Sequence, residues 1–151
     1  FSPPSGAAVA LDAESGGKEW EFWTWNNVTG APVVTPETVY VVEQPPEAGA
    51  SSFALARTGD GIEPRWCSYI GDGTVTAASD DRALGIFSLD VGPGSTRSVA
   101  SFTADRGAVP WAITGGTRSD AWPNPPALVE DALVVSTRGG RVLAVSGGEG
   151  S

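Results

Sequence analysis

A motif of small apolar residues, a polar turn with glycine and a tryptophan recurs along the chain. It reads ALDAESGGKEW at residues 10–20, ALARTGDGIEPRW at 54–66 and SFTADRGAVPW at 101–111, and a last copy, AVSGGEGS at 144–151, lacks the tryptophan. Trp20, Trp66 and Trp111 therefore recur about every 45 residues, and self-similarity at a period of roughly 20–50 residues indicates a repeat architecture.

A second recurring element lies between successive copies of this motif. It reads APVVTPETVYVVEQ at residues 31–44, GTVTAASDDRALGIFSLD at 73–90 and PPALVEDALVVST at 125–137. Each copy has an apolar run, an acidic turn and a second apolar or alternating run, which is the pattern of a β-hairpin. Together with the two strands around each glycine turn, this hairpin gives four strands per repeat.

A repeated unit of four antiparallel strands is typical of a β-propeller blade, because the apolar face of such a small sheet is covered only by the neighbouring blades. The sequence therefore predicts an all-β chain without helices, which forms about three to three and a half four-stranded antiparallel blades of a β-propeller. We place a partial blade at residues 1–25, whole blades at 26–70 and 71–115, and a further partial blade at 116–151. Because the pattern starts and stops inside blades, we expect the remaining blades of the same propeller, or a protein partner, to complete the structure.

Composition and charge agree with this fold and narrow the possible partners. The 20 Gly and 12 Pro residues suit a protein rich in turns. Aspartate and glutamate outnumber lysine and arginine by 18 to 9, so this acidic protein repels nucleic acid, and no nucleic-acid partner is expected. No apolar run reaches the roughly 18 residues of a membrane-spanning helix, so no membrane span is expected in this chain.

The residues of the first repeat resemble a known family. Its motif consists of Ala10, Asp12, Ser15, Gly16, Gly17, Lys18 and Trp20, and is followed by APVVTPETVYVV. This pattern resembles the pyrroloquinoline-quinone-like β-propeller repeat in its tryptophan-docking form, and the resemblance covers essentially the whole chain. The family includes quinoprotein dehydrogenases, the outer-membrane lipoprotein of the barrel-assembly machine, and many envelope proteins that bind no quinone.

The resemblance implies two functions of different classes. The first is a non-catalytic binding or scaffolding propeller of the cell envelope, or an extracellular one, that presents loops to a protein partner. The alternative is a fragment of a quinone-dependent dehydrogenase whose catalytic residues lie outside this chain. Pyrroloquinoline quinone with calcium is expected only under the alternative; otherwise no cofactor, no metal and no catalytic residue is predicted.

Candidate chemistry within the chain favours the first function. The single cysteine, Cys67, cannot form the vicinal disulfide of the quinone-binding members, and the absence of histidine removes the commonest general base. Cys67 lies next to Trp66 on an expected strand, where a small buried apolar side chain is the simpler interpretation. The Asp80–Asp81 pair fits a hairpin turn, with a hard-cation site as the other interpretation.

The six tryptophans fall into two groups. Trp20, Trp66 and Trp111 follow the repeat and are expected to wedge between blades, with each indole N–H bound to a backbone carbonyl. Trp23, Trp25 and Trp122 lie off the period, and we predict them as possible partner-binding residues, with covering of a sheet edge as the alternative.

Two further surface features are possible. Asn27 begins an Asn-Val-Thr sequon and is a possible glycosylation site, although chance also explains the triplet. Three segments that break the repeat, 45–51, 91–98 and 117–126, are expected to be surface loops available for recognition.

Overall fold

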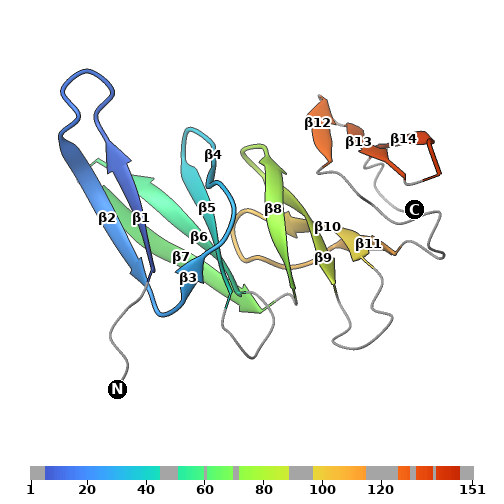
Figure 1. The fold of residues 1–151 in the computed structure, drawn as a ribbon, viewed down its shortest axis with the longest axis horizontal. Helices are drawn as coiled ribbons and strands as arrows, with labels where there is room; N and C mark the ends of the chain where they lie inside the picture. Colours follow the sequence, from blue (N-terminus) through green and yellow to red (C-terminus); the bar gives the residue numbers. More distant parts are fainter. Residues whose placement is uncertain are drawn as a thin grey trace.

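The computed structural model of the chain describes residues 6–44, 51–59, 61–69, 72–88, 97–114, 126–129, 132–137 and 139–146. In these residues the regular structure consists of β-strands without helices, as the sequence predicts. The strands form four antiparallel sheets that follow one another along the molecule, from the N-terminal to the C-terminal side (Figure 1).

Each sheet is a meander, in which strands that are consecutive in the chain lie side by side. The first sheet contains β1 (Gly6–Leu11) and β2 (Lys18–Thr24). The second contains β3 (Asn27–Val28), β4 (Val33–Val34), β5 (Thr38–Gln44), β6 (Ser51–Thr58) and β7 (Gly61–Tyr69). The third contains β8 (Asp72–Ala78), β9 (Arg82–Ser88), β10 (Arg97–Thr103) and β11 (Trp111–Thr114), and the fourth contains β12 (Ala127–Val129), β13 (Ala132–Ser136) and β14 (Val142–Ser146).

The second sheet has five labelled strands because its edge strand is interrupted. β3 pairs with the end of β5, and β4 pairs with the start of the same strand. Between them stand Gly30, with a φ of 77°, and Pro32, which has no N–H to donate to a ladder. β3 and β4 therefore occupy one edge position, and the sheet is a four-stranded unit with a break.

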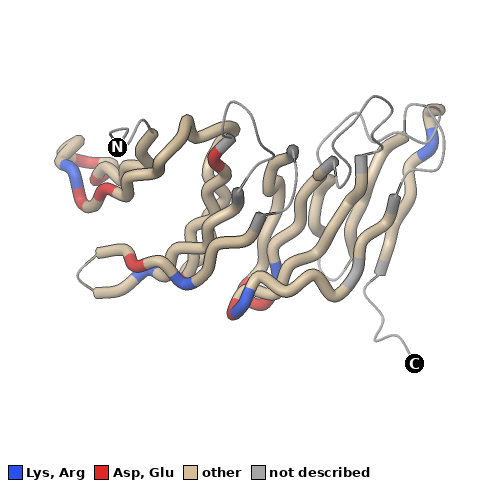
Figure 2. The backbone as a smooth tube through the Cα atoms, turned by 90° about the horizontal axis from the view of Figure 1, so that it is seen from below, with Lys and Arg blue, Asp and Glu red and all other residues tan. Residues whose placement is uncertain are grey.

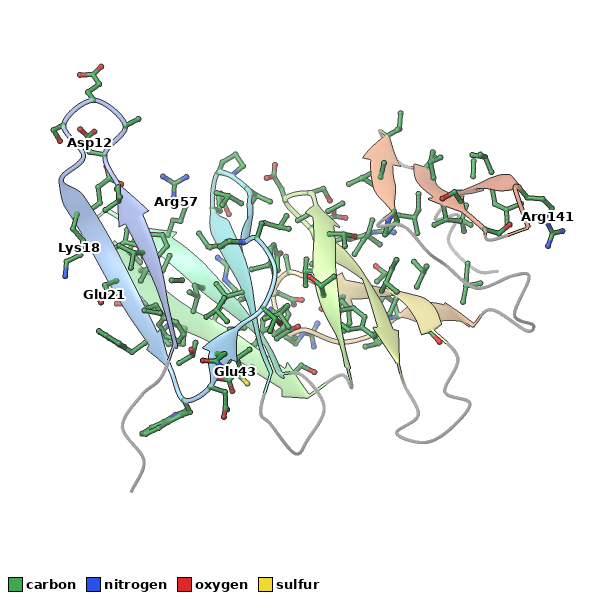
Figure 3. The ribbon with its side chains drawn as sticks, viewed as in Figure 1. Asp12, Lys18, Glu21, Glu43, Arg57 and Arg141 are labelled. Carbon is green, nitrogen blue, oxygen red and sulfur yellow. The ribbon has the colours of Figure 1, made fainter. Side chains whose placement is uncertain are left out.

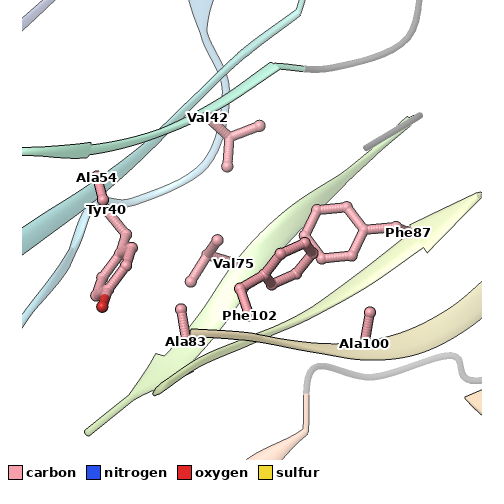
Figure 4. Close-up of a cluster of buried hydrophobic side chains, with 8 residues drawn as sticks. All are labelled: Tyr40, Val42, Ala54, Val75, Ala83, Phe87, Ala100 and Phe102. Carbon is pink, nitrogen blue, oxygen red and sulfur yellow. The ribbon is translucent and has the colours of Figure 1, made fainter. Parts of the chain in front are cut away.

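The core is divided among the three seams between neighbouring sheets. Successive residues of β5 point to opposite faces, so that Val39 and Val41 pack toward the first sheet while Tyr40 and Val42 pack toward the third. The seam between the second and third sheets is the largest of the three clusters, with Phe87 and Phe102 of the third sheet opposite Tyr40 (Figure 4). A third cluster joins the third and fourth sheets; it contains Leu84, Ile86, Val99, Leu133 and Val135.

The three apolar clusters contain no charged residue. In Figure 2 many of the Lys, Arg, Asp and Glu positions lie at turns, and others, such as Glu21 on β2 and Arg65 on β7, lie within strands. The ion pairs join residues close in sequence, such as Lys18 and Glu21 at 2.6 Å, and Arg106 and Asp105 at 2.9 Å. Exposed pairs of this kind stabilise a fold little, so apolar contact between the sheets holds the molecule together.

Gly85 on β9 offers a test of how tightly the third sheet is packed. A Cβ at this position would overlap the ring of Phe87 and the carbonyl oxygen of Thr74. We expect Gly85→Ala to lower the free energy of unfolding by about 1–3 kcal/mol, the usual cost of overpacking a core. Urea denaturation measures the change, with Gly59→Ala as the control because a Cβ there meets nothing within 4 Å. Equal effects of the two substitutions would contradict the packing described for β9.

Candidate functional site

Trp66 joins the second sheet to the third. It lies on β7 opposite Ala54, on the face of the sheet turned toward the third sheet. Its indole Nε1 donates a hydrogen bond of 2.9 Å to the carbonyl oxygen of Ala104, and its ring stacks on Phe102 at a centroid distance of 6.4 Å. The expectation that a periodic tryptophan wedges between sheets and binds a backbone carbonyl is confirmed at this position.

The turn that receives Trp66 spans residues 103–108. Thr103 N donates a hydrogen bond to Ala108 O at 2.9 Å, and Gly107 N donates to Thr103 O at 2.9 Å. Gly107 has a φ of 66°, and a Cβ on it would stand 2.7 Å from Cδ2 and Cε3 of Trp66. Only glycine meets both the backbone conformation and the close approach of the indole.

This turn is a feature that the sequence interpretation missed. The third motif, SFTADRGAVPW, differs in most letters from the first, ALDAESGGKEW, but both place a glycine four residues before the tryptophan. Gly16 and Gly107 are these glycines, and both adopt positive φ. The spacing from glycine to tryptophan is the signal that would have found the turn.

The other two periodic tryptophans differ from Trp66. Trp20 packs against the cluster of Ala8, Val39, Val41 and Leu55, in the seam between the first and second sheets. Pairing of β6 with β7 continues to Thr58 and Gly61, so the second sheet has a longer hairpin where the third has its receiving turn. Among the described residues no hydrogen bond from the Trp20 indole is seen, and the Trp111 side chain lies outside the described part of the structure.

We expect Trp66→Ala to lower the free energy of unfolding by about 3–5 kcal/mol, as a large-to-small change in a core seam. Trp66→Phe keeps a ring in the seam but leaves the Ala104 carbonyl without its donor, so it should cost about 1–3 kcal/mol. Denaturation followed by circular dichroism measures both. Trp23→Ala is the matched control, because this side chain is 56 % exposed. Losses of similar size at Trp66 and Trp23 would contradict the role given to Trp66.

Trp23 and Trp25 form an exposed aromatic pair at the end of β2. They are 56 % and 59 % exposed and flank Thr24, which is buried and donates a 2.7 Å hydrogen bond from Oγ1 to Asn26 O. Trp23 lies on β2, and Trp25 lies in the bend that follows this strand. Their predicted role in partner binding stays a prediction, and so does that of Trp122, which lies outside the described residues together with most of segments 45–51, 91–98 and 117–126.

Asn27 and Glu43 lie near this aromatic pair. Asn27 is exposed and begins the short strand β3, rather than standing in a loop, and its glycosylation stays a prediction. Glu43 is only 5 % exposed, and its Oε2 accepts a hydrogen bond of 3.1 Å from Asn26 N. This buried side chain therefore anchors the link between β2 and β3. A single glutamate on a strand has no sequence pattern that predicts this role.

The expectation that Cys67 is buried is wrong, because its side chain is exposed. Cys67 lies on β7, the edge strand of the second sheet, opposite Phe53 of β6. Its side chain points to the face opposite that of Trp66. Partial burial of the sulfur still raises the pKa of the Cys67 thiol, and the negative charge of Glu43 raises it further.

The raised pKa has a measurable consequence for Cys67. Less of the thiol is ionised at neutral pH than in an unstructured peptide, and the thiolate is the nucleophile. We expect a disulfide reagent to reach Cys67 in the folded chain but to react several-fold more slowly than with the urea-unfolded chain, with the difference shrinking as the pH rises. Equal rates in both states at neutral pH would contradict this assignment.

Asp81 belongs to a turn between β8 and β9. Its carboxylate accepts hydrogen bonds from Ser79 Oγ at 2.7 Å and from Arg82 Nε at 3.2 Å. The hydrogen bond from Ser79 and the contact with Arg82 lower the pKa of Asp81. The turn interpretation of the Asp80–Asp81 pair therefore accounts for Asp81, and within the described residues no group of three or more His, Cys, Asp or Glu side chains is arranged to hold a metal ion.

The acidic turn also anchors the receiving turn of its own sheet. Asp81 O accepts a hydrogen bond of 2.9 Å from Ala104 N, the residue whose carbonyl binds Trp66. The second sheet repeats the arrangement, since Glu37 O accepts a hydrogen bond of 2.8 Å from Arg57 N. In the third sheet the acidic turn and the turn at residues 103–108 are thus in direct contact.

Four antiparallel meanders packed face to face, with a tryptophan of one sheet bound by a turn of the next, define part of a β-propeller. Comparison with solved structures agrees: 21 chains match, among them BamB from Moraxella catarrhalis, with a TM-score of 0.64 and 16 % sequence identity. The match covers 95 % of this chain and 40 % of that chain, so this chain spans less than half the length of BamB. At this identity the likeness shows the fold alone.

No family model matches the sequence, and no curated protein matches it. Among the described residues no helix is long and apolar enough to cross a membrane.

Proposed function

We propose that this chain is part of a non-catalytic binding or scaffolding propeller of the cell envelope, built from tryptophan-docking repeats of the pyrroloquinoline-quinone-like type. The observation that carries the proposal is the exposed Trp23 on β2, followed by the exposed Trp25 in the next bend, on a sheet whose opposite face is packed against its neighbour. Large aromatic side chains that are exposed on a rigid support are typical anchors of protein interfaces.

The support under the aromatic pair is well ordered by contacts. Phe22, which lies between Glu21 and Trp23 on β2, packs edge to face on Phe53 of the second sheet at 5.7 Å. Thr24 and Glu43 hold the backbone on the other side of Trp23 through their hydrogen bonds to residue Asn26. Binding through Trp23 and Trp25 therefore orders little additional chain, which lowers the entropic cost of association.

The chemistry of the surroundings indicates the kind of partner. The chain carries a formal net charge of −9, and Glu21 shares the face of Trp23 along β2. A partner with an apolar pocket for an indole and a basic rim fits this surface, because complementary charge speeds association. The assignment to the cell envelope is supported by the resemblance of the repeats and by the propeller fold shared with BamB.

A photo-cross-linking residue placed at Trp23 tests the partner surface in cells that express the protein. We expect Trp23 to give one defined covalent adduct with an envelope protein, and Trp25→Ala to reduce that adduct several-fold. Val109, in the connection between β10 and β11, is 46 % exposed and serves as the control position, where no adduct is expected. Adducts of equal yield at both positions, or none at Trp23, would overturn the proposed interface.

A second measurement separates the proposal from a dehydrogenase. Because the alternative places the catalytic residues outside this chain, the chain is tested together with the remaining blades of its propeller: this protein is mixed with pyrroloquinoline quinone and calcium, and reduction of an artificial dye is followed with alcohols or sugars as substrates. We expect no dye reduction above that of the free quinone. Turnover that depends on the chain would contradict the non-catalytic function.

A further inference from the structure

β7 is the last strand of the second sheet, and among the described residues no strand pairs with its outer side. The hydrogen-bonding direction of its backbone follows from the neighbouring ladder. Arg57 N donates to Glu37 O at 2.8 Å, in register with the pairing of β6 with β5. Because residues of an antiparallel strand alternate in the direction of their N–H and C=O groups, the odd-numbered residues of β6 bond to β5 and the even-numbered ones bond to β7.

This alternation continues across β7. Trp66 and Ser68 pair with even-numbered residues of β6, so their backbone groups point into the sheet. Cys67 and Tyr69 pair with odd-numbered residues, so their N–H and C=O groups point away from the sheet. Pro64 agrees with this pattern, since it also pairs with an odd-numbered residue and has no N–H to lose at an outward position. We call the outward backbone groups of Cys67 and Tyr69 the open edge.

The two halves of β7 differ in how they protect this side of the sheet. Toward the hairpin turn, residues 63–65 (Glu-Pro-Arg) provide two charges, a missing donor and a register shift, which are features that keep an edge strand from pairing. Residues 66–69 contain no charge and no proline. Figure 3 shows Arg57 at the protected end of the second sheet and Glu43 at the other end, where the open edge lies.

The last strands of the other sheets are shorter or charged. β11 has four residues and β14 has five, and short edge strands resist pairing. β2 has seven residues but carries Lys18, Glu19 and Glu21. β7 has nine residues. In the described part of the chain, the open edge is therefore the stretch best suited to pair with another strand.

The open edge has a fixed backbone and apolar surroundings. The indole of Trp66, the residue before Cys67, is held by its hydrogen bond to Ala104 O. On the other face, the exposed Cys67 lies opposite Phe53, which is half-buried and in edge-to-face contact with Phe22. A strand that pairs here needs little ordering of this chain, which lowers the entropic cost of association.

We propose that the open edge binds an extended segment of a partner protein, which adds a strand to the second sheet beside β7. The backbone of that segment exchanges hydrogen bonds with Cys67 and Tyr69. Its side chains opposite these two residues are apolar, because they share the face that carries Phe53 and Phe22. The residue between them is basic, since this chain has a formal net charge of −9 and complementary charge speeds association.

Charge disfavours a second copy of this chain as the occupant, because two chains of net charge −9 repel one another. Further blades leave the edge free, since the sheets pack through their faces and the open edge is at the rim of a sheet. The inference rests on the proposed function for the existence of a partner. The contact itself is separate from Trp23, which lies on β2.

Amide hydrogen exchange of the full chain labelled with ¹⁵N tests the open edge. In the free chain we expect the amides of Cys67 and Tyr69 to exchange quickly and those of Trp66 and Ser68 to exchange slowly. The probe is the capped peptide Val-Lys-Val-Lys-Val in excess. It should slow exchange at Tyr69 by about tenfold or more, because a paired amide is protected. The same peptide with N-methyl groups on its valines keeps its charge but should give no protection.

Three variants of the chain complete the design. Cys67→Pro removes the outward N–H and should abolish the protection of Tyr69, since proline is accepted at an outward edge position. Cys67→Ala keeps the N–H and should bind the peptide as the unchanged chain does. Trp23→Ala should also leave the protection unchanged, so that failure of the proposed function at Trp23 is distinguished from failure at the open edge.

Four results would overturn the proposal. The first is slow exchange of Tyr69 in the free chain at every concentration, and the second is no protection by the unmethylated peptide. The third is equal protection by the two peptides, or equal protection in the Cys67→Pro and Cys67→Ala chains; if circular dichroism shows that Cys67→Pro is unfolded, the peptides alone decide. The fourth is protection that appears on concentrating the chain without peptide, which would assign the open edge to a second copy.

Discussion

The structure depends on the apolar faces that each small sheet cannot cover with its own strands. Val39 and Val41 of β5 are buried only because the first sheet lies over them, and Tyr40 and Val42 only because the third sheet lies over the opposite face. Each sheet is therefore stabilised by its neighbours, and stability is a sum over seams rather than the property of one central core. The order of sheets in space follows the order of the chain for the same reason, since consecutive meanders bury their faces with the shortest connections.

Trp66 fixes the position of the second sheet relative to the third. The hydrophobic effect is non-directional, whereas the hydrogen bond from the indole to Ala104, 38 residues away in the sequence, has a preferred distance and angle. The glycine beneath the ring makes that geometry exclusive, because a Cβ on Gly107 would push the indole away from the carbonyl. The acidic turn at Asp81 then holds Ala104 in place from the other side. A few polar contacts therefore align the two sheets on either side of an apolar seam. This accounts for a tryptophan that recurs while the residues around it differ between copies of the motif.

The fold class was predictable from the sequence because it rests on residues with strong local preferences. Tryptophan spacing, glycine turns and the acidic hairpin turns give the number of strands per unit, and the meanders agree with them. The details that failed depend on neighbours. Cys67 alternates correctly on its strand, yet it lies on the edge strand β7 of the second sheet, where its side chain is exposed. The second motif looks like the other two, but its two additional residues (54–66 against 101–111) extend the β6–β7 hairpin and remove the receiving turn.

The turns at residues 12–17 and 103–108 have the same backbone hydrogen bonds although their side chains differ. Asp12 and Ser15 close the first turn with side-chain hydrogen bonds, whereas Thr103 occupies the position of Asp12 in the third sheet and its hydroxyl accepts a bond from Ala108 N at 3.3 Å. Different side chains therefore produce the same backbone, and only glycine with positive φ is shared at the point of contact. Because the backbone supplies both the carbonyl and the platform, the capacity to bind an indole belongs to the turn and not to any particular side chain.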